Sequence, residues 1–90
     1  MIEKRILIAN QTGLHARPAA QFVQAAAKFK SRVMISKAGR EVDAKSIISV
    51  LSLGAGKGTE ITLKAEGEDE GAAIDALVAL IQSNFGEGTV

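Results

Sequence analysis

The residues best suited to do chemistry form one short stretch, residues 12–18 (TGLHARP), which holds the only histidine and the only proline of the chain. Pro18 has no backbone N–H and a fixed φ, so it suits the first turn of a helix. Free N–H groups and the positive end of the helix dipole attract anions at such a helix N-terminus. A neutral imidazole at His15, with the Arg17 cation two residues away, is therefore suited to meet a phosphoryl group.

The residues after this stretch are expected to form the helix that positions it. Apolar side chains recur there at three- and four-residue steps, as on the buried face of an amphipathic helix: Ala19, Phe22, Val23, Ala26 and Phe29. The pattern predicts a helix over residues 19–29, with Pro18 in its first turn and His15 just before it. A lone histidine is often only a satisfied surface or core group, but placement at a helix N-terminus favours a functional role.

The rest of the chain predicts the scaffold. Strand patterns cover residues 2–8, 32–37, 40–43 and 59–66. A last helix is predicted to begin near the acidic residues 68–70 and to end at Gly86 and Gly88. Its apolar face has helical spacing: Ile74, Leu77, Val78, Ile81 and Phe85. The order βαββαβα predicts an α+β fold, in which an antiparallel sheet buries both long helices on one face.

A second candidate site is centred on Ser46. Serine is a good N-cap, and the apolar residues after it predict a short helix of one to two turns, ended by Gly54. Such a helix cannot bury Ile47, Ile48 and Leu51 together, so part of this set should be exposed and should form a docking site. The glycine-rich residues 54–58 do not fit a Walker phosphate-binding loop, since Leu51 stands where its first glycine must be. They are expected to be a simple connection.

Composition argues against several other functions. The chain has no cysteine and one histidine, so we expect no metal site and no cofactor. Its 11 Lys and Arg residues are scattered and nearly balance 10 Asp and Glu residues, which argues against a nucleic-acid partner. No apolar run is long enough for membrane insertion, and no signal peptide is evident. We expect one cytoplasmic, monomeric domain over residues 1–90.

Three segments of the chain resemble HPr, the histidine-containing phosphocarrier of the bacterial phosphoenolpyruvate-dependent sugar phosphotransferase system. They are residues 13–19 (GLHARPA), residues 45–47 (KSI) with 53–54 (LG), and residues 65–70 (AEGEDE). The similarity runs without gaps over nearly the whole chain. It implies an HPr-like open-faced β-sandwich, with a four-stranded antiparallel sheet of order 1-4-2-3 and three helices on one face.

The resemblance also implies a function for each candidate residue. His15 would accept a phosphoryl group on Nδ1 from enzyme I and pass it to sugar-specific IIA proteins, with Arg17 assisting. The chain would then be a stoichiometric carrier and not an enzyme. Ser46 would be the regulatory site modified by HPr kinase/phosphorylase, with a catabolite-control transcription factor as a further partner. Partners would dock on four residues: Ala16, Ile47, Ile48 and Leu51.

Two alternatives stay open at this point. Residues 83–86 (SNFG) resemble the nitrogen-branch phosphocarrier, which has regulatory partners. A regulatory interaction module of the same fold would bind partners without carrying phosphate. A catabolite-repression relative lacks the active histidine, and His15 argues against that assignment. A serine-type hydrolase is disfavoured because no nucleophile-elbow pattern exists.

Overall fold

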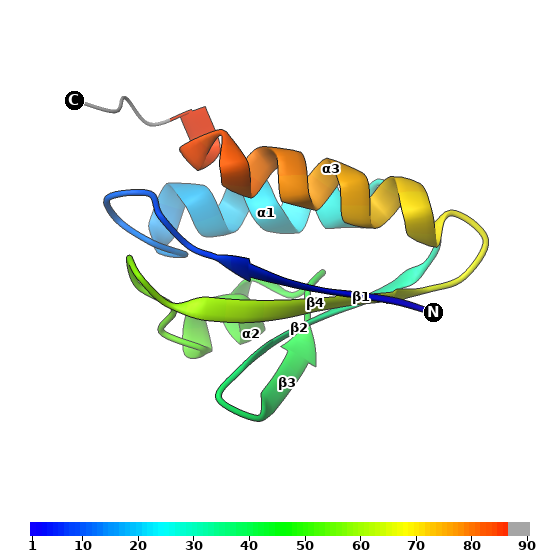
Figure 1. Cartoon of the computed structure of the whole chain (residues 1–90), viewed down its shortest axis with the longest axis horizontal. Helices are drawn as coiled ribbons and strands as arrows, with labels where there is room; N and C mark the ends of the chain where they lie inside the picture. The colour runs from blue at the N-terminus through cyan, green and yellow to red at the C-terminus, as the bar shows by residue number, and fades with distance from the viewer. Residues whose placement is uncertain (87–90) are drawn as a thin grey trace.

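The computed structural model describes residues 1–86, and its strands and helices follow the predicted order (Figure 1). The strands are β1 (Ile2–Leu7), β2 (Arg32–Lys37), β3 (Arg40–Asp43) and β4 (Glu60–Glu66). The helices are α1 (Ala16–Ala27), α2 (Ile47–Ser52) and α3 (Glu70–Gln82), followed by the 3₁₀ helix η1 (Asn84–Gly86). Local hydrophobic periodicity therefore identified every strand and α-helix that positions the candidate site.

The strands form one antiparallel sheet in the order β1-β4-β2-β3. β4 is central, with Ile35 of β2 opposite Leu63 and Ile6 of β1 opposite Ile61. α1 and α3 lie side by side over one face of this sheet (Figure 1). α2 contacts α1, and its Val50 joins the same core. The α+β open-faced sandwich and the strand order 1-4-2-3 are thus confirmed.

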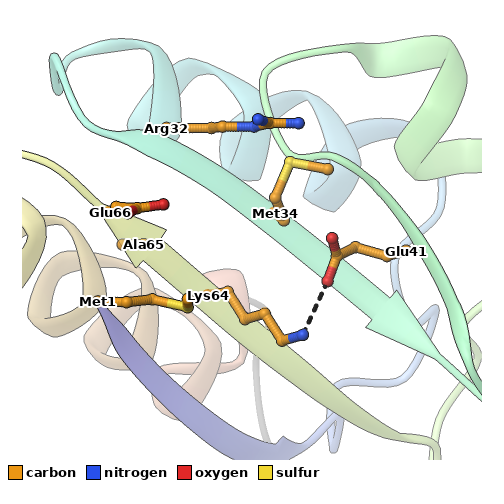
Figure 2. A pocket seen from close by; sticks show the side chains of 7 residues that line it. All are labelled: Met1, Arg32, Met34, Glu41, Lys64, Ala65 and Glu66. Atoms are coloured by element: carbon orange, nitrogen blue, oxygen red, sulfur yellow. Dashed lines mark ion pairs between the residues drawn. The ribbon is translucent and has the colours of Figure 1, made fainter.

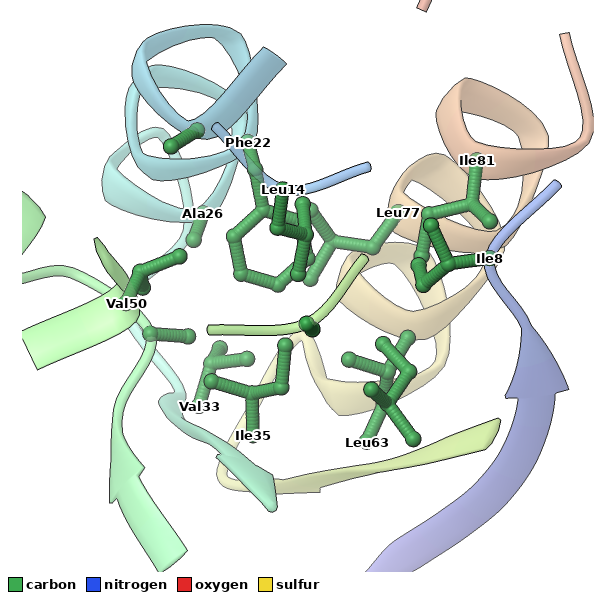
Figure 3. Packing of buried hydrophobic residues seen from close by; sticks show 14 of the residues in the cluster. Ile8, Leu14, Phe22, Ala26, Val33, Ile35, Val50, Leu63, Leu77 and Ile81 are labelled. Carbon is green, nitrogen blue, oxygen red and sulfur yellow. The ribbon is translucent and has the colours of Figure 1, made fainter. Parts of the chain in front are cut away.

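The core lies between the sheet and the helices. Phe22 of α1, Leu77 of α3 and Leu63 of β4 are fully buried and converge there (Figure 3). β4 alternates strictly, because its inward side chains face this core and its outward ones face the open side of the sheet. Burying one large apolar side chain contributes about 1.5–3 kcal/mol. This packing fixes α1, and with it the residues at its N-terminus, against the sheet.

The limits of α1 differ from the predicted range of residues 19–29. The helix begins at Ala16 and ends at Ala27, so Pro18 lies inside its first turn and Phe29 beyond its end. Phe29 is half-buried rather than on a buried helix face. The earlier start makes His15 the N-cap residue itself. The candidate histidine is therefore part of the helix terminus.

The end of α3 also differs from the prediction. The helix stops at Gln82, and the prediction that Phe85 lies on its buried face is wrong. Asn84, Phe85 and Gly86 all have positive φ, at 56°, 55° and 75°. In this turn Phe85 is buried, with only 4% of its surface exposed. Phe85 is therefore apolar because it reaches the core from the turn, although its position in the sequence also fits the helical spacing. Gly88, the second predicted stop, lies outside the described residues.

Candidate functional site

His15 is the N-cap of α1, with extended backbone angles (φ −122°, ψ 154°). Its carbonyl accepts the first helical hydrogen bond, from the Ala19 N–H at 3.3 Å. The imidazole makes no capping hydrogen bond and is exposed. An exposed imidazole so placed stands at the positive end of the helix dipole and does not spend a ring nitrogen on capping the helix.

The loop before the histidine is held against the segment that follows α2. The Leu14 N–H donates to the Ala55 carbonyl at 2.7 Å. The Asn10 side-chain amide donates to the Gly13 carbonyl at 2.9 Å. Gly13 has φ +64°, and a Cβ there would lie 2.5 Å from the Ala55 oxygen. Only glycine fits this approach, so the glycine-rich segment, which was expected to be a simple connection, helps to position His15.

Ala16 and Arg17 form the exposed beginning of α1. Ala16 has φ +32°, a region that residues other than glycine seldom adopt. Arg17 is exposed and makes no hydrogen bond or ion pair with another described residue. Together with His15, Thr12 and Pro18, these two residues line one hollow. The structure therefore brings the imidazole and a guanidinium to the same opening.

Ser46 caps α2, as the sequence predicted. Its Oγ accepts from the Ser49 N–H at 3.4 Å. Three apolar side chains of α2 remain exposed, and we call them the apolar patch: Ile47 (38%), Ile48 (77%) and Leu51 (38%). Val50, in contrast, is buried. Exposure of several large apolar side chains on one short helix indicates a docking surface.

The apolar patch reaches the histidine through Leu51. Leu51 and His15 line one hollow of about 120 Å³, which is also lined by Thr12, Leu14 and residues 54–56. Ile47 and Ile48 lie on the same helix, nearer to Ser46. The residues that the sequence singled out thus lie at the start of α1 and along α2 with its cap Ser46, and Leu51 on the last turn of α2 is the one that lines a hollow with His15.

Sequence reasoning missed two cations at the end of α2. Lys37 Nζ donates to the Leu53 and Gly54 carbonyls, at 3.1 Å each. The Arg40 guanidinium donates to the Ser52 carbonyl at 3.0 Å. In the sequence they were two of many scattered cations. Their one distinguishing signal is that they flank a two-residue hairpin turn.

Another hollow, of about 200 Å³, lies on the open face of the sheet (Figure 2). Lys64, on its wall, pairs with Glu41 at 3.0 Å and with Glu3 at 3.7 Å. The hydrogen bond and charge of Glu41 raise the pKa of Lys64 above its usual value of 10.5. A cation already held between two carboxylates is poorly suited to receive a phosphate. As a site for a phosphoryl group, the hollows lined by His15 are therefore favoured over the one on the open face of the sheet.

Within residues 1–86, no group of three or more His, Cys, Asp or Glu residues is arranged to hold a metal ion. In the same range, no helix combines the length and apolar character needed to cross a bilayer.

The chain is similar to known proteins over almost its whole length. Residues 2–83 match the family model described as "PTS HPr component phosphorylation site". The phosphocarrier protein HPr of Cupriavidus necator is 50% identical over 88 residues, which cover 98% of this chain and 99% of that relative. The HPr-like protein Crh of Halalkalibacterium halodurans is 50% identical over 82 residues, or 91% and 98% of the two chains.

The fold is equally close to a solved structure. The crystal structure of HPr-C-His from Thermoanaerobacter tengcongensis matches with a TM-score of 0.97 and 54% sequence identity. The match covers 99% of this chain and 100% of that one. Sequence and structure therefore lead to the same group of proteins.

Proposed function

The chain belongs to the HPr family of phosphocarrier proteins, and on that premise we propose that His15 carries a phosphoryl group from phospho-enzyme I to sugar-specific IIA proteins. The strongest support is the imidazole of His15, which is exposed at the N-terminus of α1 and makes no capping hydrogen bond. The chain acts in the cytoplasm as a monomeric, stoichiometric carrier. It is modified and restored by its partners, needs no cofactor, and is not itself an enzyme.

Transfer to His15 is a displacement at phosphorus. The lone pair of the neutral imidazole attacks, and a P–N bond forms as the bond between phosphorus and the enzyme I donor breaks. Negative charge on the phosphoryl oxygens is stabilised by the α1 dipole and by Arg17. Donation to a IIA protein is a second displacement, in which a nucleophile of that protein forms a bond to phosphorus as the His15–phosphorus bond breaks and the neutral imidazole is restored.

Partners dock on Ala16 and the apolar patch. Leu51 supports this assignment, because it shares a hollow with His15 and is exposed. The patch provides apolar contact area beside the reacting group, and the exposed Arg17 provides charge at its edge. Docking there would exclude water from the imidazole during transfer.

Ser46 is the regulatory phosphorylation site in this proposal. Its hydroxyl stands at the start of the helix that carries the apolar patch. A phosphate there adds about two negative charges, which must be desolvated when a partner docks. HPr kinase/phosphorylase would add this phosphate, and a catabolite-control transcription factor would bind the modified form.

The carrier function is tested with phosphoenolpyruvate and enzyme I. The parent chain should gain a phosphate that is labile in acid and stable in alkali, as expected for a phosphohistidine. His15→Ala should gain no such acid-labile phosphate, since the chain has no other histidine. Its melting temperature should match that of the parent because the imidazole is exposed and makes no capping hydrogen bond. Phosphate acceptance by His15→Ala would refute the proposal.

A regulatory interaction module is the second candidate, favoured by the 50% identity to Crh. In that function the apolar patch and Ser46 would act without phosphoryl transfer at His15. The same assay separates the two, because a module would leave phosphoenolpyruvate unused. A nitrogen-branch carrier would accept phosphate as well, and it is distinguished by preferring that branch's own enzyme I.

A further inference from the structure

The β2–β3 hairpin brings two cations to the C-terminal end of α2. Lys37 ends β2, Arg40 begins β3, and the two residues pair directly across the strands. The turn between them has Ala38 and Gly39 at positive φ, 50° and 84°. Two such residues give a tight hairpin whose twist matches its strands. The hairpin tip is therefore a defined support for both side chains.

These cations bind the backbone carbonyls that end α2. Lys37 Nζ lies 3.1 Å from both the Leu53 and Gly54 oxygens. The Arg40 guanidinium lies 3.0 Å from the Ser52 carbonyl oxygen and 3.1 Å from its Oγ. The last carbonyls of a helix lack helical partners and carry partial negative charge. Three successive carbonyls are thus held by the hairpin.

The bound carbonyls lie next to the contact that holds the histidine loop. Ala55 follows Gly54 directly, and its carbonyl accepts the Leu14 N–H. Leu51, on the last turn of α2, lines the hollow beside His15. α2 has only six residues, and so short a helix depends on tertiary contacts for its position.

We propose that Lys37 and Arg40 are positioning residues that fix the apolar patch relative to His15. The inference deepens the proposed function and rests on it, because the partner that reads this arrangement is taken to be enzyme I. A surface fixed in advance binds more tightly, since docking need not order it. A simple attraction between these cations and an acidic partner is the competing explanation.

Amide hydrogen exchange tests the positioning without any partner. In Lys37→Met/Arg40→Met, exchange at the Gly54 and Leu14 amides should accelerate about tenfold or more through local opening. The Leu63 amide, in the central strand, should show that global stability is kept. Lys57→Met removes one positive charge, half of that lost in the double variant, from an exposed lysine that holds no carbonyl, and it should leave both amides unchanged. Unchanged exchange at Gly54 and Leu14 in the double variant would overturn the proposal.

Phosphorylation kinetics test the consequence for docking. The double variant should raise the KM of enzyme I for this chain about tenfold with kcat nearly constant, equal to a loss of ~1.4 kcal/mol in binding. Lys37→Arg/Arg40→Met, which keeps donors at residue 37, should bind enzyme I better than the double Met variant. The rise in KM of the double Met variant should persist in high salt. An equal rise in KM with Lys57→Met would overturn positioning in favour of charge attraction. If even the parent accepts no phosphate, the proposed function fails, while the exchange result still decides the positioning.

Discussion

The two ends of α1 use their polar groups in opposite ways. Beyond the C-terminal end, the Lys30 and Ser31 N–H groups donate to the Asp69 carboxylate at 2.9 and 2.8 Å, and the Ser31 hydroxyl donates to it as well. The Asp69 N–H in turn donates to Ser31 Oγ at 3.1 Å. At the N-terminal end, His15 and Arg17 have no comparable partner among the described residues.

This difference does not come from looser packing of the backbone at the histidine. A Cβ on Gly13 would lie 2.5 Å from the Ala55 oxygen, and a Cβ on Gly67 would lie 2.7 Å from Ser31 Oγ. The backbone is thus closely packed at both ends. The Asp69 end uses its side chains to join α1, β2 and α3, whereas the His15 end leaves its side chains accessible for chemistry.

After loss of His15 itself, Arg17→Glu should give the largest effect at the His15 end. We expect transfer from enzyme I to slow about a hundredfold, because a hydrogen bond to a charged group is worth about 1.5–3 kcal/mol and the new carboxylate adds repulsion. The melting temperature should change little, since Arg17 makes no hydrogen bond or ion pair with any residue in the range 1–86. Arg5→Glu, the same change on the open side of β1, is the matched control. Equal slowing by both variants would reduce Arg17 to a general surface charge.

Ser46→Asp should have a smaller effect, of the same functional kind. The added carboxylate borders the apolar patch, and we expect enzyme I to bind about tenfold more weakly, or ~1.4 kcal/mol. Negative charge at a helix N-terminus is favourable, so the melting temperature should stay constant or rise.

Ser46→Ala separates the charge from the cap. It should transfer phosphate normally while losing about 0.5–2 kcal/mol of stability with the cap. Enzyme I titration and thermal melts measure the two quantities. Parent-like transfer kinetics for Ser46→Asp at low salt would show that Ser46 is only a cap.

The His15 end was largely predictable from the sequence because its determinants are local. Pro18 and the apolar spacing after it located the helix start, and Ser46 located the next one. Exposure of Ile47, Ile48 and Leu51 followed from counting how much a short helix can bury. The strand order came from the resemblance to HPr, since local patterns do not specify which strands pair.

The Asp69 end was not predictable, because its partners are distant in the chain. The sequence suggested that the acidic residues 68–70 serve the dipole of the last helix. Asp69 instead reaches Ser31, 38 positions earlier. The contacts of Lys37 with Leu53 and Gly54, 16 and 17 positions apart, were missed for the same reason. Periodicity reports which face of an element is buried but not which polar groups meet across elements.

Asp69 should give the smallest effect, one on stability in acid. The Ser31 hydroxyl and the Lys30 and Ser31 N–H groups lower the pKa of Asp69 from 3.8 to about 2. Because the folded-state pKa is the lower one, the carboxylate stabilises the fold fully above about pH 5 and loses this contribution as the pH falls toward 2. The Gly67 N–H and the N-terminal amine lower the pKa of Glu70 in the same way, so part of the acid dependence should remain without Asp69.

Asp69→Asn should therefore melt several degrees below the parent at pH 7, and the difference should shrink steadily on acidification. Glu68→Gln, which alters an exposed neighbouring carboxylate, should follow the parent throughout. Phosphoryl transfer by Asp69→Asn at a temperature where it is folded should stay within about twofold of the parent, a difference of ~0.4 kcal/mol. A melting difference that is constant between pH 7 and pH 2 would assign the stabilisation to packing rather than charge. A large loss of transfer would show that the two ends of α1 are coupled, and the contrast between them would no longer hold.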